Sequence, residues 1–332
     1  MSPSVVEGVL VVDKPAGPTS HDVVARVRGL FSTRRVGHAG TLDPPATGVL
    51  LVGLGRATRL MRFLQSLEKV YAATVVFGTS TTTQDATGEV VERRPCTFTE
   101  ETLRAEVRRF VGDIEQVPPM VSAVKVGGEP LHRAARRGEV VDRPPRRIRI
   151  HDLTIESYDP AAQTADIRVR CSSGTYVRTL ASDLGDRLGC GAHLAALRRL
   201  AIGSFPVSEA TTLGALESME RAERQQAVLP MAAALRDFPS VTVEGRSLEG
   251  VRNGRPIDAP AAAPQGPAGP EGLAAPEGLA AAAGAVAVLD PAGELIAVYE
   301  PWTEGGEAGD PPGRLRPAAV LAAATEAVAP SR

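Results

Sequence analysis

Hydrophobic positions along the first 236 residues predict alternating strands and amphipathic helices. Short apolar runs at 8–12, 49–52 and 71–77 are typical of strands, and alternation at 147–155 and 165–171 predicts two half-exposed strands. Between them, apolar residues recur at the three- and four-residue spacing of helices. The four predicted helical stripes are Val23, Val24, Val27, Leu30 and Phe31; Leu60, Met61, Leu64 and Leu67; Leu103, Val107, Phe110 and Val111; and Leu180, Leu184 and Leu188.

The pattern changes after about residue 236. A short strand is predicted at 240–243 and a short helix at 244–253, where Gly254 would end it. Two further apolar runs, 286–289 and 294–299, flank the sequence Asp-Pro-Ala-Gly and predict a hairpin. We therefore expect two domains, residues 1–236 and 237–332.

An unusual segment, residues 259–284, interrupts the second domain. Of its 26 residues, 21 are Ala, Pro or Gly, and the hexapeptide PEGLAA occurs twice in tandem, at 270–275 and 276–281. A segment with so few large apolar side chains cannot bury a core. It is expected to be a disordered insert.

Composition excludes several classes of protein. With 43% hydrophobic and 23% charged residues, the chain is typical of a soluble globular protein. Its three cysteines are widely spaced and none forms a CxxC pair, which argues against a disulfide framework or a zinc site. The five histidines show no metal-ligand spacing, so no metal is expected. The sequence shows no apolar run of membrane-spanning length and no secretory signal, and we expect a cytoplasmic protein.

Charge is divided unevenly between the two predicted domains. The net charge is −2, but residues 1–236 hold 31 Lys and Arg against 26 Asp and Glu, a net +5, while residues 237–332 carry −7. From 125 to 149 there are eight basic and three acidic residues. Such a run is often only a solvated face. It also suits contacts with the phosphates of a nucleic acid.

The most distinctive stretch is GHAGTLDPPATG at 37–48. It places His38 and Asp43 close together in sequence, and Pro44 biases Asp43 towards an extended or turn-like backbone. Gly37 and Gly40 allow positive φ or the close approach of another backbone segment. Two interpretations are open from these residues alone: a carboxylate held rigidly against a ligand, or a tight turn whose aspartate bonds its own backbone.

The whole stretch resembles the catalytic motif of the TruB family, the bacterial tRNA pseudouridine(55) synthases. Further segments are similar to motifs of the same family: DKPAGPTS at 13–20, KVY at 69–71, GTYVR at 174–178 and GAHLAALRRL at 191–200. The resemblance covers roughly residues 8–206 with specific motifs and the remainder loosely.

The resemblance implies a fold and a reaction. The expected fold is α+β, a pseudouridine-synthase-type mixed, largely antiparallel sheet with flanking helices, followed by a small PUA-like β-barrel domain that binds RNA. The implied reaction isomerises uridine 55 in the T-loop of tRNA to pseudouridine without a metal or organic cofactor. The target base must be flipped out of the folded RNA, detached from the ribose, turned and rejoined through carbon.

The family motifs assign roles to named residues. Asp43 is the implied catalytic residue, as nucleophile or as base. Arg178 would pair with it, which favours the charged carboxylate. The residues implied to contact the substrate are His38, taking up the vacated stack; Tyr71, stacking on the base; Tyr176, lining the uridine pocket; and Leu197, an apolar wall.

Two further segments are implied to meet RNA. The basic residues of 125–149 correspond to a thumb-like insertion that closes on the RNA, with Lys125, Arg136 and Arg137 as expected contacts. Asp85, in a polar loop at 79–88, is an expected RNA contact or a turn-stabilising residue; both remain open.

The implied partner is the T-stem-loop of tRNA, bound by a monomer that requires no membrane and no protein partner. Two rival functions share some of these features. A tRNA-folding chaperone would need the basic half without the chemistry of Asp43 and Arg178. The catalytic subunit of an RNA-guided pseudouridylation complex would share the motifs, but the chain has no long basic tail and keeps a continuous thumb-like segment.

Overall fold

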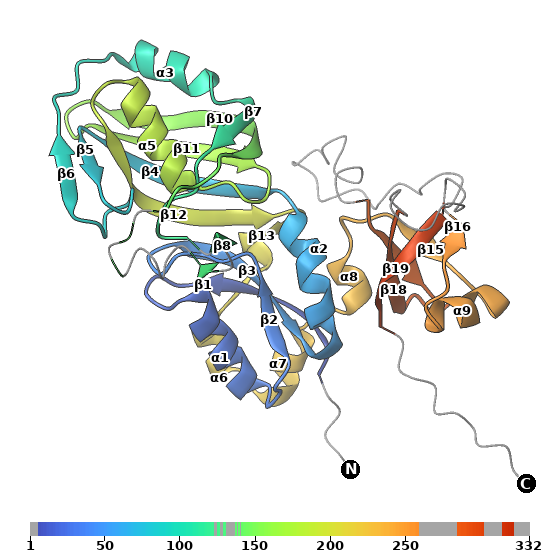
Figure 1. Cartoon of the computed structure of the whole chain (residues 1–332). Helices are drawn as coiled ribbons and strands as arrows, with labels where there is room; N and C mark the ends of the chain where they lie inside the picture. The colour runs from blue at the N-terminus through green and yellow to red at the C-terminus, as the bar shows by residue number, and fades with distance from the viewer. Residues whose placement is uncertain are drawn as a thin grey trace, which may run out of the picture.

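A ten-stranded sheet is the framework of the first domain in the computed structural model (Figure 1). The structure describes residues 6–122, 125–126, 129–130, 137, 139, 141–258, 284–301 and 314–321. The strands of this sheet are β1 (Gly8–Lys14), β2 (Val36–Ala39), β3 (Thr47–Leu54), β4 (Lys69–Phe77), β7 (Gly112–Gln116), β10 (Arg146–Asp159), β11 (Thr164–Cys171), β12 (Ala192–Ile202), β13 (Phe205–Pro206) and β14 (Thr211–Thr212).

The strand order is β14-β1-β3-β12-β4-β11-β10-β7, with β2 beside β3 and β13 beside β12. Only the pairs β1–β14 and β3–β12 are parallel. The expected mixed, largely antiparallel sheet is confirmed, including both predicted half-exposed strands. Two small hairpins lie apart from it, formed by β5 (Thr79–Thr81) with β6 (Val90–Arg93) and by β8 (Lys125–Val126) with β9 (Glu129–Pro130).

Helices flank the sheet as the hydrophobic spacing predicts. Their bounds are α1 (Ser20–Leu30), α2 (Met61–Ser66), α3 (Glu100–Arg108), α5 (Val177–Arg187), α6 (Leu213–Ser218), α7 (Arg221–Gln226) and α8 (Met231–Ala234), with 3-10 turns η1 (Gly55–Leu60) and η2 (Val207–Glu209). Thr19 and Asp22 form a capping box at the start of α1, and Thr99 caps α3. None of the helices in the described part of the chain is long and apolar enough to span a membrane.

Three apolar clusters bury the two faces of the sheet. Helices α3 and α5 pack on β4, β10 and β11, whereas α1 and α6 pack on one face of β1 and β3. The other face of β1 and β3 packs against α2, α8 and the second domain. One predicted core position is wrong: Val111 is 45% exposed, because α3 ends at Arg108 and Val111 lies beyond the helix.

The sheet divides where β3 meets β12. These strands pair at only two positions, Thr47 with Arg198 and Gly48 with Arg199. A Cβ on Gly48 would lie 2.1 Å from the carbonyl oxygen of Arg199, so the close approach requires glycine there. The loop between β2 and β3, which carries Asp43, therefore lies at the junction between the two halves of the sheet.

The second domain is a five-stranded sheet with one helix beside it (Figure 1). Its strands run in the order β15-β17-β18-β19-β16, which agrees with the expected small PUA-like domain. The elements are β15 (Ser240–Thr242), α9 (Gly245–Arg252), β16 (Ile257–Asp258), β17 (Val286–Leu289), β18 (Leu295–Pro301) and β19 (Arg314–Val320). The predicted hairpin is confirmed, and the proposed boundary at residue 236 falls between α8 and β15. Of the predicted insert 259–284, residues 259–283 lie outside the described part of the chain.

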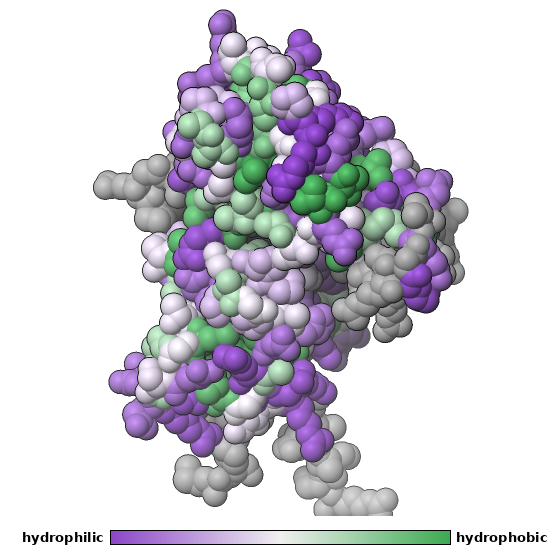
Figure 2. All heavy atoms as spheres, turned by 90° about the vertical axis from the view of Figure 1, so that its left-hand side faces the viewer, coloured by the Kyte–Doolittle hydropathy of each residue, from purple (hydrophilic) through white to green (hydrophobic). Residues whose placement is uncertain are grey.

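The two domains share an apolar contact. Ala285, Ala287, Leu295, Val298 and Leu321 pack with the cluster around α2 and α8. At full burial each large aliphatic side chain contributes roughly 1.5–3 kcal/mol, so this shared core joins the domains more firmly than the exposed ion pair of Arg62 with Glu300 (3.2 Å). On the face shown in Figure 2, which carries the β5–β6 hairpin, apolar residues form separate groups among hydrophilic ones.

Candidate active site

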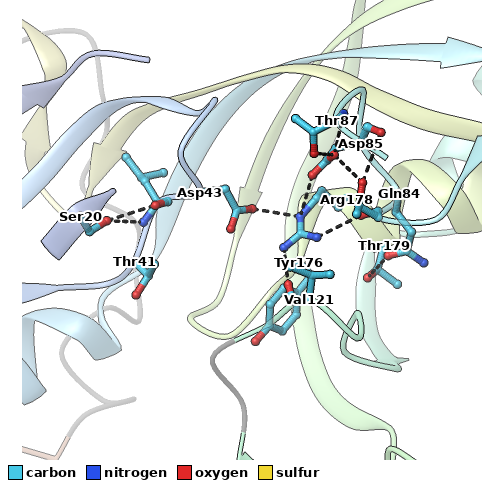
Figure 3. A network of polar contacts seen from close by, with 12 residues as sticks. Ser20, Thr41, Asp43, Gln84, Asp85, Thr87, Val121, Tyr176, Arg178 and Thr179 are labelled. Atoms are coloured by element: carbon cyan, nitrogen blue, oxygen red, sulfur yellow. Dashed lines mark hydrogen bonds and ion pairs between the residues drawn. The ribbon is translucent and has the colours of Figure 1, made fainter. Parts of the chain in front are cut away.

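The loop that carries Asp43 is fixed by hydrogen bonds on both sides of the aspartate. The N–H of Ala46 donates to the carbonyl of Asp43 (3.1 Å), closing a turn over the two prolines. Before the aspartate, the buried Ser20 hydroxyl donates to the carbonyl of Leu42 (3.1 Å) and accepts from its N–H (2.9 Å) (Figure 3). The tight turn is therefore real, but it also presents Asp43 from a rigid backbone.

Two buried cations hold the same loop by its backbone. The Lys14 ammonium, fully buried, donates to the carbonyl of Pro44 (3.1 Å). The guanidinium of Arg199, 1% exposed, donates through Nε to Val49 O (2.7 Å) and through Nη2 to Gly40 O (2.9 Å). Because each cation bonds carbonyls rather than a carboxylate, both fix the main chain on either side of Asp43.

Arg178, in the first turn of α5, is the direct partner of the Asp43 side chain. Its Nε lies 2.9 Å from Asp43 Oδ2, and the arginine side chain is 5% exposed whereas the aspartate side chain is 38% exposed. Its other two nitrogens also donate: Nη1 to Thr83 O (3.0 Å) and Nη2 to Val121 O (2.8 Å) (Figure 3). A buried guanidinium with all its sides bonded has one orientation, so it fixes one oxygen of Asp43.

Asp85 is the second carboxylate near Arg178. Its Oδ2 lies 3.7 Å from Arg178 Nε, and its Oδ1 accepts from the hydroxyls of Thr83 and Thr87, both at 2.6 Å. The N–H of Thr87 also donates to Oδ1 (2.9 Å). The structure therefore gives Asp85 the turn-stabilising role. Direct contact with RNA stays a prediction, which an exposure of only 9% does not favour.

A cavity of about 480 Å³ opens beside Asp43, a size typical of small-ligand sites. It is lined by Gly40, Thr41, Leu42, Asp43, Arg62, Gln65, Ser66, Lys69, Tyr71, Ser122, Ser172, Ser173, Gly174, Thr175, Tyr176, Val177, Arg178, Leu197 and Arg199. Five residues chosen from the sequence motifs, Asp43, Tyr71, Tyr176, Arg178 and Leu197, thus meet at one cavity. Within the described residues, no group of three His, Cys, Asp or Glu side chains could hold a metal ion.

The two tyrosines enter the cavity from different elements. Tyr71 lies on β4 and is 8% exposed, and burial raises the pKa of its hydroxyl. Tyr176 is the N-cap of α5, where its N–H donates to Gln116 Oε1 (2.8 Å) and its carbonyl accepts from Gln116 Nε2 (3.1 Å). Burial also raises the pKa of Tyr176. Both rings therefore offer neutral aromatic surface at ordinary pH.

His38 lies in strand β2, just before the loop that carries Asp43, and it is absent from the residues lining the cavity. Its place in the RNA stack stays a prediction. Its ring packs edge-on against His21, with centroids 5.2 Å apart, and its buried Nδ1 has no hydrogen-bond partner among the described residues. Burial, with the charges of His21 and Arg199 nearby, lowers the pKa of His38 to about 4. The His38 ring is therefore uncharged at neutral pH. In sequence, His38 lies two residues before Gly40, which lines the cavity.

Known proteins share both halves of this site. The family model for the N-terminal domain of the TruB family pseudouridylate synthases matches residues 28–177, and the model for the tRNA pseudouridylate synthase B C-terminal domain matches 178–236. A tRNA pseudouridine synthase B of Thermobifida fusca is 53% identical over 236 residues, covering 69% of this chain and 78% of that protein. The chain belongs to the TruB family. A second relative of the same name, from Syntrophotalea carbinolica, is 50% identical over 239 residues, 72% of this chain and 78% of the relative.

Solved structures extend the likeness of this TruB family member to its second domain. The chain in the crystal structure of a Cbf5-Nop10-Gar1 complex superposes with a TM-score of 0.68 at 27% identity, covering 95% of this chain and 84% of that one. The chain in the archaeal box H/ACA sRNP Nop10-Cbf5 complex gives 0.66 at 25% identity, covering 95% and 86%. Coverage this wide includes the five-stranded sheet, and the protein is a pseudouridine synthase by family and by fold.

The thumb-like segment is described only in part. Lys125 begins β8, and Arg136 lies outside the described residues. Arg137 has a side chain that is 46% exposed and pairs with Glu139 at 2.7 Å. Their contacts with RNA stay a prediction.

Sequence reasoning missed three residues whose side chains hold the backbone of the site. Ser20, Gln116 and Arg199 contact main-chain atoms far away in sequence, and nothing in their partners' identity marks those contacts. Lys69 was passed over because only the tyrosine of its KVY motif was assigned a role. The sequence does contain a signal for it: Lys69 occupies an inward-facing position of a strand whose residues alternate between inward and outward.

Proposed function

We propose that this TruB family member converts uridine 55 of tRNA to pseudouridine, with Asp43 as the group that acts on the ribose. The observation that carries the proposal is the difference in exposure within one ion pair. Arg178 is buried, while the Asp43 carboxylate is partly exposed at a cavity that Tyr71 and Tyr176 also line. The tRNA substrate is taken from the names of the relatives, which are tRNA pseudouridine synthases B.

The cavity suits an extruded nucleotide. Removing a base from a folded RNA costs a few kcal/mol. Stacking on an aromatic ring offers about 1–3 kcal/mol per base, and Tyr71 and Tyr176 both line the cavity. Leu197 adds an apolar wall. His38 would act outside the cavity, where an uncharged ring can replace the base in the RNA stack.

The geometry leaves Asp43 one oxygen for chemistry. Arg178 holds Oδ2, and no donor among the described residues contacts Oδ1. That oxygen can attack C1′ of the ribose, or it can take a proton from C2′; the arrangement supports either role. In either case the C1′–N1 bond breaks in that step with its electron pair on the base, which then turns. After attack at C1′, C5 of the base displaces the Asp43 carboxylate from C1′; after removal of the C2′ proton, C5 adds to C1′ of the resulting C1′=C2′ double bond while Asp43 returns the proton to C2′. The base then loses the C5 proton and gains one at N1, so that the product is an isomer of the substrate.

Arg178 keeps a counter-charge during this cycle. If Asp43 becomes an ester or a neutral acid, Asp85 still lies 3.7 Å from Arg178 Nε. A buried guanidinium without any carboxylate would be costly. The pair of carboxylates therefore lets the charge on Asp43 change while Arg178 stays in place.

We also propose that the protein acts alone, as a cytoplasmic monomer, on the T-stem-loop. The solved neighbours are subunits of complexes with proteins and RNA, which keeps an RNA-guided role as the rival. Identity of 53% with a tRNA pseudouridine synthase B supports an enzyme that acts without a guide RNA or partner subunits. Contacts of residues 125–149 and of the second domain with RNA are part of the same proposal, although the second domain is acidic.

One experiment separates the alternatives. Purified protein alone is incubated with an unmodified tRNA transcript, and pseudouridine is mapped at single-nucleotide resolution. Modification confined to position 55, and lost when that uridine is replaced by cytidine, supports the proposal. Modification only after a guide RNA or protein subunits are added supports the RNA-guided role. Tight binding with no modification under any of these conditions supports a chaperone.

A further inference from the structure

Lys69 is a buried lysine that the reaction described so far does not use. It is the first residue of β4, it is 5% exposed, and it lines the cavity together with Asp43 and Tyr71. Lys69 and Tyr71 are two residues apart on one strand, so their side chains point to the same face of the sheet. A ligand held by Tyr71 therefore lies within the surroundings of the Lys69 ammonium.

No carboxylate pairs with this ammonium among the described residues. Its Nζ donates to the carbonyls of Gln65 and Leu67, the latter at 2.5 Å, which leaves one N–H without a partner in that part of the chain. The neighbouring acid, Glu68, bonds His151 (3.0 Å) and lies 3.9 Å from Arg170 instead. A cation in this position is costly to bury, and burial lowers the pKa of Lys69 to about 7.

A second buried cation reinforces the field. A Cβ placed on Gly40 would lie 3.9 Å from Lys69 Cε and 3.6 Å from Arg199 Nη1, so both cations border the same point of the cavity wall. Arg199 is occupied with the carbonyls of Gly40 and Val49. The cavity thus has Asp43 with its partner Arg178, and in addition two cations that pair with no carboxylate in the described part of the chain. This part of the cavity wall therefore carries a positive charge that an anionic ligand could neutralise.

Two anions could meet this wall in the proposed reaction: a phosphate of the RNA backbone, or the base itself. The base enters neutral. When the C1′–N1 bond breaks, its electron pair stays on the base, and the negative charge spreads over N1, O2 and O4. A fixed cation beside the base stabilises that charge only when it develops, which is how an enzyme lowers a barrier without tightening substrate binding.

We propose that Lys69 is a catalytic residue that stabilises the anionic base formed when the C1′–N1 bond breaks. The protonated form of Lys69 acts only as a charge and transfers no proton, so the atom balance of the isomerisation is unchanged. Negative charge that develops on the nearby base favours this protonated form. The inference rests on the proposed function. A phosphate contact, or a purely structural role at the end of α2, are the outcomes that the test must separate from it.

The test compares Lys69→Met with Lys69→Arg and with Leu197→Ala, a cavity-wall variant that carries no charge. Single-turnover rates of loss of the N1-linked nucleoside, and dissociation constants, are measured with tRNA carrying uridine or 5-fluorouridine at position 55, and thermal melting checks folding. Loss of the N1-linked nucleoside is the step that both substrates share, because 5-fluorouridine has no C5 proton to lose and stops at a C5-linked adduct. Fluorine withdraws electrons and makes the base a better leaving group. Without the Lys69 cation, the rate of breaking the C1′–N1 bond should therefore depend more strongly on the fluorine substituent.

For Lys69→Met we expect an unchanged dissociation constant and a rate for uridine that falls by about 10²-fold, the usual effect of losing one donor at a developing anion. The ratio of the 5-fluorouridine rate to the uridine rate should rise above the wild-type ratio. Lys69→Arg should retain much of the rate. In Leu197→Ala the rate should fall while the ratio stays at the wild-type value.

Three results would overturn the inference. An unchanged rate in Lys69→Met removes the catalytic role. Weaker binding with a smaller salt slope assigns Lys69 to a phosphate. A slower rate whose fluorine ratio matches wild type assigns it to support of α2. If Lys69→Met does not fold, Lys69→Gln takes its place with the same criteria, because its amide can still donate to the carbonyls of Gln65 and Leu67 but carries no charge. Wild-type protein that fails to modify position 55 in the same assay refutes the proposed function instead.

Discussion

Asp43 and Arg178 form an ion pair of 2.9 Å in which one partner is 38% exposed and the other 5% exposed. The exposed partner can meet a substrate, and the buried partner can be held by the protein alone. This asymmetry predicts different consequences for removing each of them. It also explains why a short motif around Asp43 is followed, more than a hundred residues later, by a second motif that ends in Arg178.

Removing the charge of Asp43 should abolish chemistry and leave binding and folding nearly intact. Asp43→Asn keeps the size of the side chain but loses the reacting oxygen. Arg178 retains Asp85 and two carbonyls, so the stability loss should be about 1 kcal/mol or less, as for exposed pairs. We expect tRNA binding within a few-fold of wild type and no pseudouridine in a single-turnover assay. Clear residual turnover, after contaminating wild-type enzyme is excluded, would refute the assignment of Asp43.

Removing Arg178 should instead destabilise the fold. Arg178→Met leaves Asp85 buried without its cation and leaves the carbonyls of Thr83 and Val121 without donors. Loss of one partner from a buried pair costs about 3–5 kcal/mol. Arg168→Met is a matched control, because Arg168 pairs with Glu156 on the surface of the sheet at 2.6 Å. That variant should lose about 0–1 kcal/mol in chemical denaturation. Equal losses in both would show that the Arg178 cluster contributes no more than a surface pair.

The sequence predicted side-chain partners better than main-chain partners. The pairing of Asp43 with Arg178 followed from two motifs, since a buried arginine requires a carboxylate. The anchoring of the same loop by Arg199 did not, because a carbonyl acceptor such as Gly40 O leaves no trace in residue identity. Val111 was misplaced because the position of a helix end is also not visible in the hydrophobic spacing. Its helical spacing was correct, but the helix ended three residues earlier, and periodicity alone does not set that end.

His38 shows how far a local motif can be trusted. The motif placed it beside Asp43 in sequence, and the backbone between them was expected to be a loop. Pairing of Val36–Ala39 with β3 extends the sheet to His38 and directs its ring towards His21. The register of a strand depends on its neighbour, which the motif does not contain.

The half-buried His38 ring should make the fold sensitive to acid. Its pKa falls from 6.5 to about 4 in the folded protein, so between these values the unfolded chain binds a proton that the folded chain does not. Stability is therefore fully kept above pH 6.5 and decreases as the pH falls towards 4. With screening of a half-buried group, the loss should be about 1–2 kcal/mol.

His38→Gln should flatten this dependence, as measured by urea unfolding at a series of pH values. Histidines that do not contact His38 contribute alike in both proteins and cancel in the difference, whereas any change in His21, which packs against His38, is part of the measured effect. The difference in unfolding free energy between variant and wild type should shift in favour of the variant as the pH falls. A difference that stays constant with pH would show that His38 titrates alike in the folded and unfolded chains.

The insert at 259–284 should be dispensable, and the strand order fixes how short its replacement can be. It connects β16 to β17, which lie at positions separated by β18 and β19 in the second sheet. Neighbouring strands are about 4.8 Å apart, so the crossing is roughly 14 Å in a flat sheet and less in a curled one. Eight Gly and Ser residues reach up to about 26 Å when extended, which is ample. Replacing residues 259–284 by such a linker should leave the melting temperature and tRNA modification almost unchanged. A lower, still cooperative melting transition would show instead that the segment packs on the domain. A control that joins Asp258 directly to Ala285, about 3.8 Å between Cα atoms, cannot make the crossing and should strain the edge strand β16 and lower the melting temperature.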